Sequence, residues 1–229
     1  MQYIKIRDAI LEQIEQGLLP PGRKLPSERK LAEHFNTTRV TLREALSLLE
    51  SEAIIFREDR RGWFISPAKF VYKLTPNADF YSQCEIQSKV GEAELVSSKK
   101  ILADKRSTSL LSLAPFSEVI HLKWCRKIDD RRAAFVETYL VADVFSGHQA
   151  LFAEGKEPVD LIYTHVGKYS TSQITGGALS QDEAGYLNIT SGAPTIKLTR
   201  DLVDENNNKI AVEIAQWRHD IVALSIETS

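Results

Sequence analysis

Residues 25–66 read LPSERKLAEHFNTTRVTLREALSLLESEAIIFREDRRGWFIS, and this stretch decides the fold of the first part of the chain. Ser27 is suited to be the N-cap of a short helix, which the Asn-Thr pair at 36–37 ends. A longer helix is expected over residues 38–51, because apolar residues recur there at helical spacing. Its apolar stripe consists of Leu42, Ala45, Leu46 and Leu49.

The flanking segments complete the pattern. Upstream, residues 3–16 have helical periodicity, and Gly17 with the Pro-Pro-Gly run at 20–22 ends that helix. Downstream, two β-prone runs at 54–57 and 63–65 surround a charged turn and predict a hairpin. A helix, a short helix, a tight turn, a third helix and a hairpin together predict a winged helix-turn-helix domain over residues 1–66.

Charge is concentrated in this domain, although the whole chain of 229 residues has a net charge of only −2. Between residues 22 and 43 there are six basic side chains against two acidic ones, Glu28 and Glu33. A basic patch of this kind is typical of DNA-binding surfaces. On charge alone, a solvated polar face is the preferred interpretation of the pattern.

The helix over residues 38–51 has an outer face suited to the major groove. Its arginines can bridge a guanine edge or hold a phosphate, and its threonine hydroxyls can do either. The candidate contacts on this face are Thr38, Arg39, Thr41 and Arg43. The hairpin tip adds Arg60, Arg61 and Gly62, which can approach the DNA backbone or the minor groove. The alternative is a small helical domain with a polar outer face.

Several function classes are excluded by composition. No apolar run approaches the ~20 residues that a membrane span needs, and the N-terminus lacks the pattern of a signal peptide. The two cysteines, Cys84 and Cys125, are too few for a disulfide framework or a four-cysteine zinc site, and the five histidines are scattered. A cytoplasmic protein with no membrane partner, metal or cofactor is expected.

The second part of the chain predicts an α+β domain with an antiparallel sheet over residues 77–229, after a linker at 67–76 with proline near both ends. Strands are expected at 93–101, 118–128, 134–140, 172–179, 195–203, 209–217 and 220–227. Helices are expected at 105–113, 159–169 and 181–188.

Two of these strands carry carboxylates beside small or aromatic residues. By the two-residue period of a strand, Glu137 and Tyr139 share one face of their strand, and Glu213 shares a face with Trp217 on another. Such faces can line a ligand pocket, with carboxylates that orient the ligand. A solvent-facing polar strand face is the alternative.

The first 66 residues resemble the GntR family of bacterial transcription regulators. The similarity lies in the Pro-Gly and Leu-Pro-Ser-Glu-Arg motifs before Arg29 and in the Thr-Leu-Arg-Glu-Ala-Leu motif at 41–46. The resemblance implies that Arg29 holds phosphate, that Arg39 and Arg43 read or clamp the groove, and that Gly62 marks the wing tip. Two residues depart from the family pattern, since Ala53 and Arg60 replace usual glycines. An alanine at position 53 would cost on the order of 1 kcal/mol if the left-handed conformation is kept, or would shift the helix end.

The remainder resembles the UTRA effector domain of the HutC-type subfamily, which shares its fold with chorismate lyase. The matching stretches are Phe135-Val-Glu-Thr-Tyr-Leu, Asp182-Glu-Ala-Gly-Tyr-Leu, and Leu198-Thr-Arg followed by Val212-Glu and Trp217-Arg-His-Asp. The resemblance implies effector contacts at Glu137 and Glu213, and dimer contacts in this domain.

The family's two basic positions before the glutamate fall on Cys125 and Lys127, so one basic residue is absent here. Arg126 lies between them, on the face shared with Trp124 unless a bulge shifts the register. An anionic effector is therefore expected to use Lys127 rather than the usual pair. Further lining candidates are Tyr163 and Asp160 in the expected helix and Asn77 and Tyr81 after the linker.

These observations predict a dimeric repressor that reads a palindromic operator and responds to a small anionic effector. If Asp160, Glu137 and Glu213 converge, an aminophosphonate or an amino-sugar phosphate would fit. The alternative is an enzyme of chorismate-lyase-like fold fused to a DNA-binding domain. No nucleophile elbow, phosphate-binding glycine loop or metal spacing supports that alternative, and no catalytic residue is assigned. A DNA-binding architectural protein without a ligand would leave the large second domain unexplained.

Overall fold

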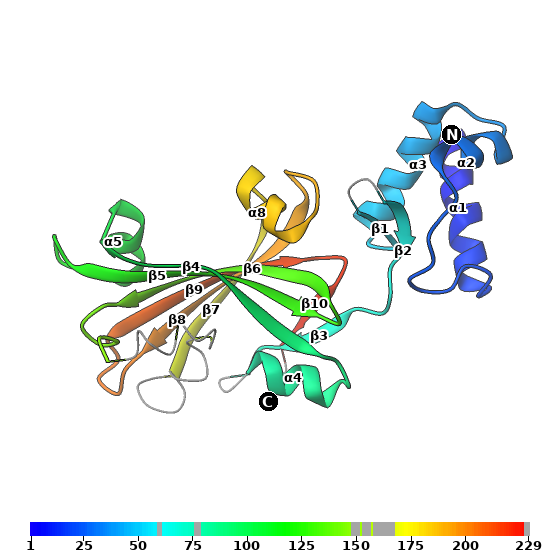
Figure 1. Cartoon of the computed structure of the whole chain (residues 1–229). Coiled ribbons are helices and arrows are strands. Elements are labelled where there is room, and N and C mark those ends of the chain that lie inside the picture. Colours follow the sequence, from blue (N-terminus) through cyan, green and yellow to red (C-terminus); the bar gives the residue numbers. More distant parts are fainter. Residues whose placement is uncertain (59–60, 76–78, 148–151, 153–156, 158–167, 227–229) are drawn as a thin grey trace.

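The structure is a computed structural model that describes residues 1–58, 61–75, 79–147, 152, 157 and 168–226. A small helical part and a larger part built on a sheet are joined by a single connecting segment (Figure 1). This division agrees with the α+β fold expected from the sequence.

The N-terminal part is a winged helix-turn-helix. It contains α1 (Gln2–Glu15), α2 (Glu28–His34) and α3 (Arg39–Ser51), followed by the hairpin of β1 (Ile55–Glu58) and β2 (Gly62–Ile65). Two side chains set the helix starts, because Ser27 accepts from the Lys30 amide and Thr38 accepts from the Thr41 amide. The core of this part is made of residues from all three helices and the hairpin: Ile6, Ile10, Leu25, Leu31, Ala32, Leu42, Ala45, Leu46, Leu49, Ile55, Trp63 and Ile65.

The segment expected to be a linker contains a strand. β3 (Phe70–Lys73) pairs in parallel with β10 (Val222–Ser225), and Phe70 and Tyr72 are buried in the core of the second part. The expectation of a linker over residues 67–76 is therefore wrong for these four residues. Pro67 lies three residues before this strand begins.

The second part is built on one six-stranded antiparallel sheet of order β4-β5-β6-β9-β8-β7. Its strands are β4 (Gly91–Leu102), β5 (Glu118–Ile128), β6 (Arg131–Val141), β7 (Lys168–Ala178), β8 (Pro194–Val203) and β9 (Lys209–Arg218). All six were expected from the sequence, and β5 has the expected bounds. The register of β5 against β6 shifts between Arg126 and Lys127, which marks a bulge.

Three described helices accompany the sheet: α4 (Phe80–Ile86), α5 (Lys105–Leu111) and α8 (Gln181–Leu187). Both α5 and α8 were expected, whereas α4 was not. The helix expected at 159–169 lies outside the described residues, except that its last two residues belong to β7. The main core lies on the sheet face that carries Trp124 and Trp217, together with Phe80 of α4.

Candidate DNA-binding and effector sites

A basic groove of about 810 Å³ runs over the winged helix-turn-helix, between the start of α2, the start of α3 and the hairpin. Six cationic side chains line it, against the single carboxylate of Glu28: Lys24, Arg29, Lys30, Arg39, Arg57 and Arg61. Three elements thus gather positive charge on one surface, as the sequence predicted. A groove of this sign attracts the phosphate backbone of DNA.

Arg43 is held at the side of this surface by a carboxylate. Its Nε donates to Glu28 Oε2 at 2.8 Å, and Trp63 Nε1 donates to Glu28 Oε1 at 3.3 Å. Burial raises the pKa of Glu28, but the hydrogen bonds from Arg43 and Trp63 outweigh it and lower the pKa overall. Glu28 therefore links α2, α3 and the hairpin while it orients the arginine toward solvent.

The start of α3 presents its side chains outward. Thr38 and Thr41 are joined by their hydroxyls at 3.0 Å, and Arg39 is exposed between them. Val40 is 68% exposed and points away from the buried stripe of the same helix. An exposed valine on this face can contact the methyl group of thymine, a role that charge-based reasoning from the sequence did not include.

The remaining candidates on this surface are ion-paired within the domain. Arg29 donates to Glu33 at 2.8 Å, and Arg61 at the wing pairs with Glu58. Both arginines are more than 60% exposed, so these pairs are weak and a phosphate can replace the carboxylate. Gly62 has φ of +100°, a conformation that L-residues rarely adopt, at the tip of the wing. Arg60 lies outside the described residues.

The effector candidates do not form one pocket. In the β6–β9 register, Thr138 is opposite Glu213 and Glu137 is opposite Ile214. Residues that are opposite each other share a face and neighbours along a strand alternate, so Glu137 and Glu213 lie on opposite faces of the sheet. The convergence of these two carboxylates, on which the choice of an amine-bearing ligand depended, is therefore not found. Alternation assigned each residue to the correct face of its own strand, but it does not fix how one strand is aligned with the next.

The face of Glu213 carries a buried charge cluster. Arg126 Nη2 donates to Glu213 Oε2 at 2.9 Å, and Arg200 Nη2 donates to Glu213 Oε1 at 2.6 Å. Arg126 Nε donates to both carboxylate oxygens of Glu157, at 2.8 and 3.0 Å. All four side chains are at most 2% exposed. Two guanidinium groups and two carboxylates thus neutralise one another inside the domain.

Opposite charges keep Glu213 and Arg126 ionised despite burial. Burial raises the pKa of Glu213, but the positive charges of Arg126 and Arg200 lower it to about 2. Burial also lowers the pKa of Arg126, but Glu157 and Glu213 hold it well above its ordinary value. The Arg126 side chain lies over the Phe80 ring at 5.2 Å and the Trp217 ring at 5.7 Å. Its Nη1 atom is buried and has no hydrogen-bond partner among the described residues.

The opposite face holds a second and more exposed cluster around Glu137. Arg106 from α5 donates to Glu137 at 2.9 Å, and His121 lies 3.2 Å from its other oxygen. Burial raises the pKa of Glu137, but the His121 hydrogen bond and the nearby cations outweigh it and lower the pKa to about 2. Tyr139 stacks on the His121 ring, with a centroid separation of 4.3 Å.

Lys127 belongs to neither cluster. Its Nζ lies 3.1 Å from Glu94 Oε2 on β4, beyond the bulge that follows Arg126. Cys125 is fully buried, and burial raises the pKa of its thiol, so this residue packs rather than binds an anion. Tyr81 lies beside Phe80 on α4, with ring centroids 5.3 Å apart. Tyr163, Asp160 and Asn77 lie outside the described residues.

Sequence reasoning missed two members of the buried cluster. Arg200 belongs to the Leu-Thr-Arg motif and lies opposite Glu213 in the antiparallel pair of β8 and β9. Pairing these two strands in the sequence could therefore have identified it. Glu157 lies in a region with no periodic pattern, and nothing in the sequence links it to Arg126. Among the effector candidates, the structure brings Arg126 and Glu213 together in the buried cluster, and Glu137 and Tyr139 together in the cluster on the opposite face.

Comparison with known proteins finds a matching family model for each of the two parts of the chain. Residues 2–65 match the family described as bacterial regulatory proteins, gntR family, and residues 87–223 match the UTRA domain. The chain belongs to the GntR family of regulators that carry a UTRA domain. It is a transcriptional regulator of the GntR/UTRA type.

Relatives of this GntR-family regulator align with nearly the whole of the chain. YihL of Escherichia coli K12, an uncharacterised HTH-type transcriptional regulator, is 28% identical over 93% of this chain and 92% of its own. The transcriptional repressor NagR of Bacillus subtilis is 24% identical, over 95% of this chain and 90% of its own. The crystal structure of PhnF from Mycobacterium smegmatis superposes with a TM-score of 0.67 at 21% identity, covering 98% of this chain and 99% of that one.

Two further findings concern the described part of the GntR-family regulator. It contains no group of three or more histidine, cysteine or acidic side chains arranged to hold a metal ion. None of its described helices is long and apolar enough to cross a membrane.

Proposed function

We propose that this regulator is a repressor that binds a palindromic operator as a dimer and is switched by a small anionic metabolite. The observation that carries the proposal is the union, in one chain, of a basic groove around α3 with a buried Arg126–Glu213–Arg200 cluster. The groove supplies a surface for DNA. The cluster supplies paired charges of both signs in an apolar setting, as small-molecule sites do.

The DNA-binding mode follows from the size of the N-terminal part. One winged domain meets few base pairs, and two copies related by a two-fold axis would read two half-sites. The dimer contacts are assigned to the second domain by family resemblance. Two relatives support the direction of control, since NagR and the fructoselysine utilisation regulator of Escherichia coli are described as a repressor and a probable repressor. Such a protein would act in the cytoplasm, where the chromosome lies.

The effector is assigned to the Glu213 face rather than the Glu137 face. An anionic group would take Nη1 of Arg126, which has no hydrogen-bond partner within the described part of the chain, and Glu213 would orient an amine or hydroxyl of the same ligand. Aminophosphonates and amino-sugar phosphates have both features, although the Glu137 carboxylate no longer supports this choice. Occupancy can switch DNA binding only by as much as the ligand's affinities for the two forms differ.

The DNA half is tested by substituting an arginine of α3. An operator is first selected from random duplexes with the wild-type protein. Arg43→Ala should then weaken operator binding by about 1–3 kcal/mol, measured by fluorescence anisotropy, because the arginine's contact with the DNA groove is lost. Lys105→Ala, on α5, removes an equal charge far from the groove and should leave the affinity unchanged. Equal operator affinity of the wild type and Arg43→Ala would refute the assignment.

The effector half is tested by a thermal-shift screen of phosphonates, amino-sugar phosphates and small carboxylates, followed by calorimetric titration of each hit. Binding should be lost in Glu213→Gln and kept in Glu137→Gln, because only the first residue belongs to the proposed site. The reverse pattern would place the site on the opposite face of the sheet. If no compound in these classes binds, the proposal of an anionic effector fails.

A further inference from the structure

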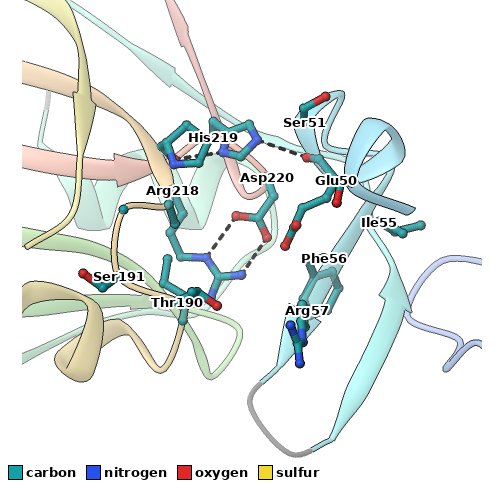
Figure 2. Close-up of a pocket in the computed structure, with 15 residues that line it drawn as sticks. Glu50, Ser51, Ile55, Phe56, Arg57, Thr190, Ser191, Arg218, His219 and Asp220 are labelled. Atoms are coloured by element: carbon teal, nitrogen blue, oxygen red, sulfur yellow. Dashed lines mark hydrogen bonds and ion pairs between the residues drawn. The ribbon is translucent and has the colours of Figure 1, made fainter. Parts of the chain in front are cut away.

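The two domains meet where strand β9 ends. The turn of Arg218, His219 and Asp220 faces the C-terminal end of α3 and the start of β1 across a cavity of about 330 Å³ (Figure 2). His219 touches both domains. Its Nδ1 lies 3.0 Å from the carbonyl oxygen of Pro194, and its Nε2 lies 3.3 Å from the carbonyl oxygen of Glu50.

The partner on the DNA-binding side is a helix end that lacks positive charge of its own. α3 ends at Ser51, so the Glu50 carbonyl belongs to its last turn, and this turn contains no basic residue. The last carbonyls of a helix carry the negative end of its dipole, which a nearby cation stabilises. The Ala53 amide already donates to Glu50, and His219 uses the remaining acceptor capacity of that oxygen.

Both partners of His219 are carbonyl oxygens, which only accept hydrogen bonds. A neutral imidazole carries one N–H and can donate to only one of them. Protonated imidazole carries two and can donate to both. The two contacts therefore form together as hydrogen bonds only when His219 is charged, and the charge also faces the helix end that favours it.

Charged groups of both signs surround the imidazole. Glu50 comes from α3 and Arg57 from β1, whereas Arg218 and Asp220 flank the histidine on its own turn. Arg218 donates to Asp220 at 3.0 and 2.7 Å, and Arg131 of β6 donates to the same carboxylate at 3.1 Å. Asp220 is thus already neutralised by two arginines. Burial raises the pKa of the Glu50 carboxyl, and the loop at 189–194 adds no charged side chain.

We propose that His219 is a protonation-dependent clamp, by which the effector domain caps the recognition helix α3 and fixes the orientation of the DNA-binding domain. This inference rests on the proposed function for its use, since β9 carries Glu213 six residues before His219. A change at the buried cluster would then reach the recognition helix along one strand. The clamp itself requires neither DNA nor ligand.

Hydrogen–deuterium exchange of the full chain tests the clamp directly. Glutamine at position 219 is neutral at every pH, so His219→Gln should raise exchange several-fold in the amides of residues 49–54 at about pH 6, where histidine is largely protonated. The difference between variant and wild type should shrink by about pH 8, because neutral imidazole can keep only one of the two hydrogen bonds, and comparison at one pH cancels the intrinsic exchange rate. His34→Gln on α2 is the matched control, because it removes an exposed histidine remote from the junction.

Two results would overturn the proposal. One is equal exchange of residues 49–54 in wild type and His219→Gln at the lower pH, and the other is a difference that persists undiminished at the higher pH. Should the variant fold poorly, the wild type alone provides the test. The amides of residues 49–54 should then lose protection from exchange, relative to those of the β5–β6 hairpin, as the pH rises from about 6 to about 8. Operator affinity of Arg43→Ala is independent of these outcomes, so failure of the clamp and failure of the regulator assignment remain distinguishable.

Discussion

Ala53 shows how much a single position can be predicted from the sequence. Its replacement of a usual glycine predicted strain, and the structure keeps the left-handed conformation there, with φ of 58°. The alanine is 5% exposed, between the end of α3 and the hairpin, so the helix end has not moved to relieve the strain. Packing of the hairpin on the helices outweighs a local conformational cost of about 1–2 kcal/mol.

Replacing this alanine should therefore stabilise the protein. Ala53→Gly removes the strain but adds about 0.4–1 kcal/mol of unfolded-state entropy, so the free energy of unfolding should rise by up to about 1 kcal/mol. Urea denaturation followed by circular dichroism measures the change. Asn36→Gly is the control, since asparagine tolerates the same conformation at φ of 46° and should change stability less. A clear loss of stability in Ala53→Gly would show that the methyl group's packing dominates.

The buried cluster was predictable only in part. Arg126 and Glu213 were named from alternation along single strands, which assigns a residue to a face. Glu157 pairs with Arg126 across 31 positions of sequence, and such a contact depends on how the chain returns to the sheet. Glu137 was placed in the same pocket because the family pattern was applied without the register of β6 against β9.

At the scale of elements, the long strands with clear alternation were predictable, whereas two short segments, β3 and α4, were missed. β5 and β9 have ten or more residues and were found within one residue of their bounds. β3 has four residues inside the expected linker, and α4 has seven residues shortly after it. Their burial against the sheet is decided by tertiary packing, which one sequence segment does not encode.

The recognition helix depends on its first side chain. Thr38 accepts from the Thr41 amide and caps α3, so Thr38→Ala should lower the free energy of unfolding by about 1 kcal/mol. Thr38→Ser keeps a hydroxyl and should cost only a few tenths of that. Denaturant midpoints of the three proteins measure the difference. If Thr38→Ala is as stable as Thr38→Ser, the cap contributes nothing to this helix and the hydroxyl is free for DNA.

For the whole molecule, the low carboxyl pKa values predict acid sensitivity. The pKa of Glu213 is about 2 in the folded chain against an ordinary 4.5, and that of Glu137 is also about 2. A lowered pKa stabilises the folded state above the ordinary value, and this contribution is lost as pH falls from about 4.5 to about 2. The free energy of unfolding should therefore fall over that range and be insensitive to these groups above it.

Substitution separates this effect from general acid denaturation. Glu213→Gln should reduce stability at neutral pH and flatten the decline below about pH 4.5, because the group that takes up the proton is gone. Glu205→Gln, on an exposed turn, should leave the profile unchanged. Denaturant titrations at several pH values measure these profiles, and a decline as steep in Glu213→Gln as in wild type would contradict the assignment.

The parallel pairing of β3 with β10 has a mechanical consequence. The chain leaves the DNA-binding domain and enters β3, so a pull on that domain acts along the strand. Backbone hydrogen bonds hold the strand at both ends. The Phe70 amide donates to the Ile221 carbonyl and the Leu74 amide donates to the Ser225 carbonyl, each at 2.8 Å. A force along a strand loads all its ladder bonds together in shear, whereas a force across it would peel them one by one. A displacement of one domain can therefore be transmitted to the other through this rigid strand pair.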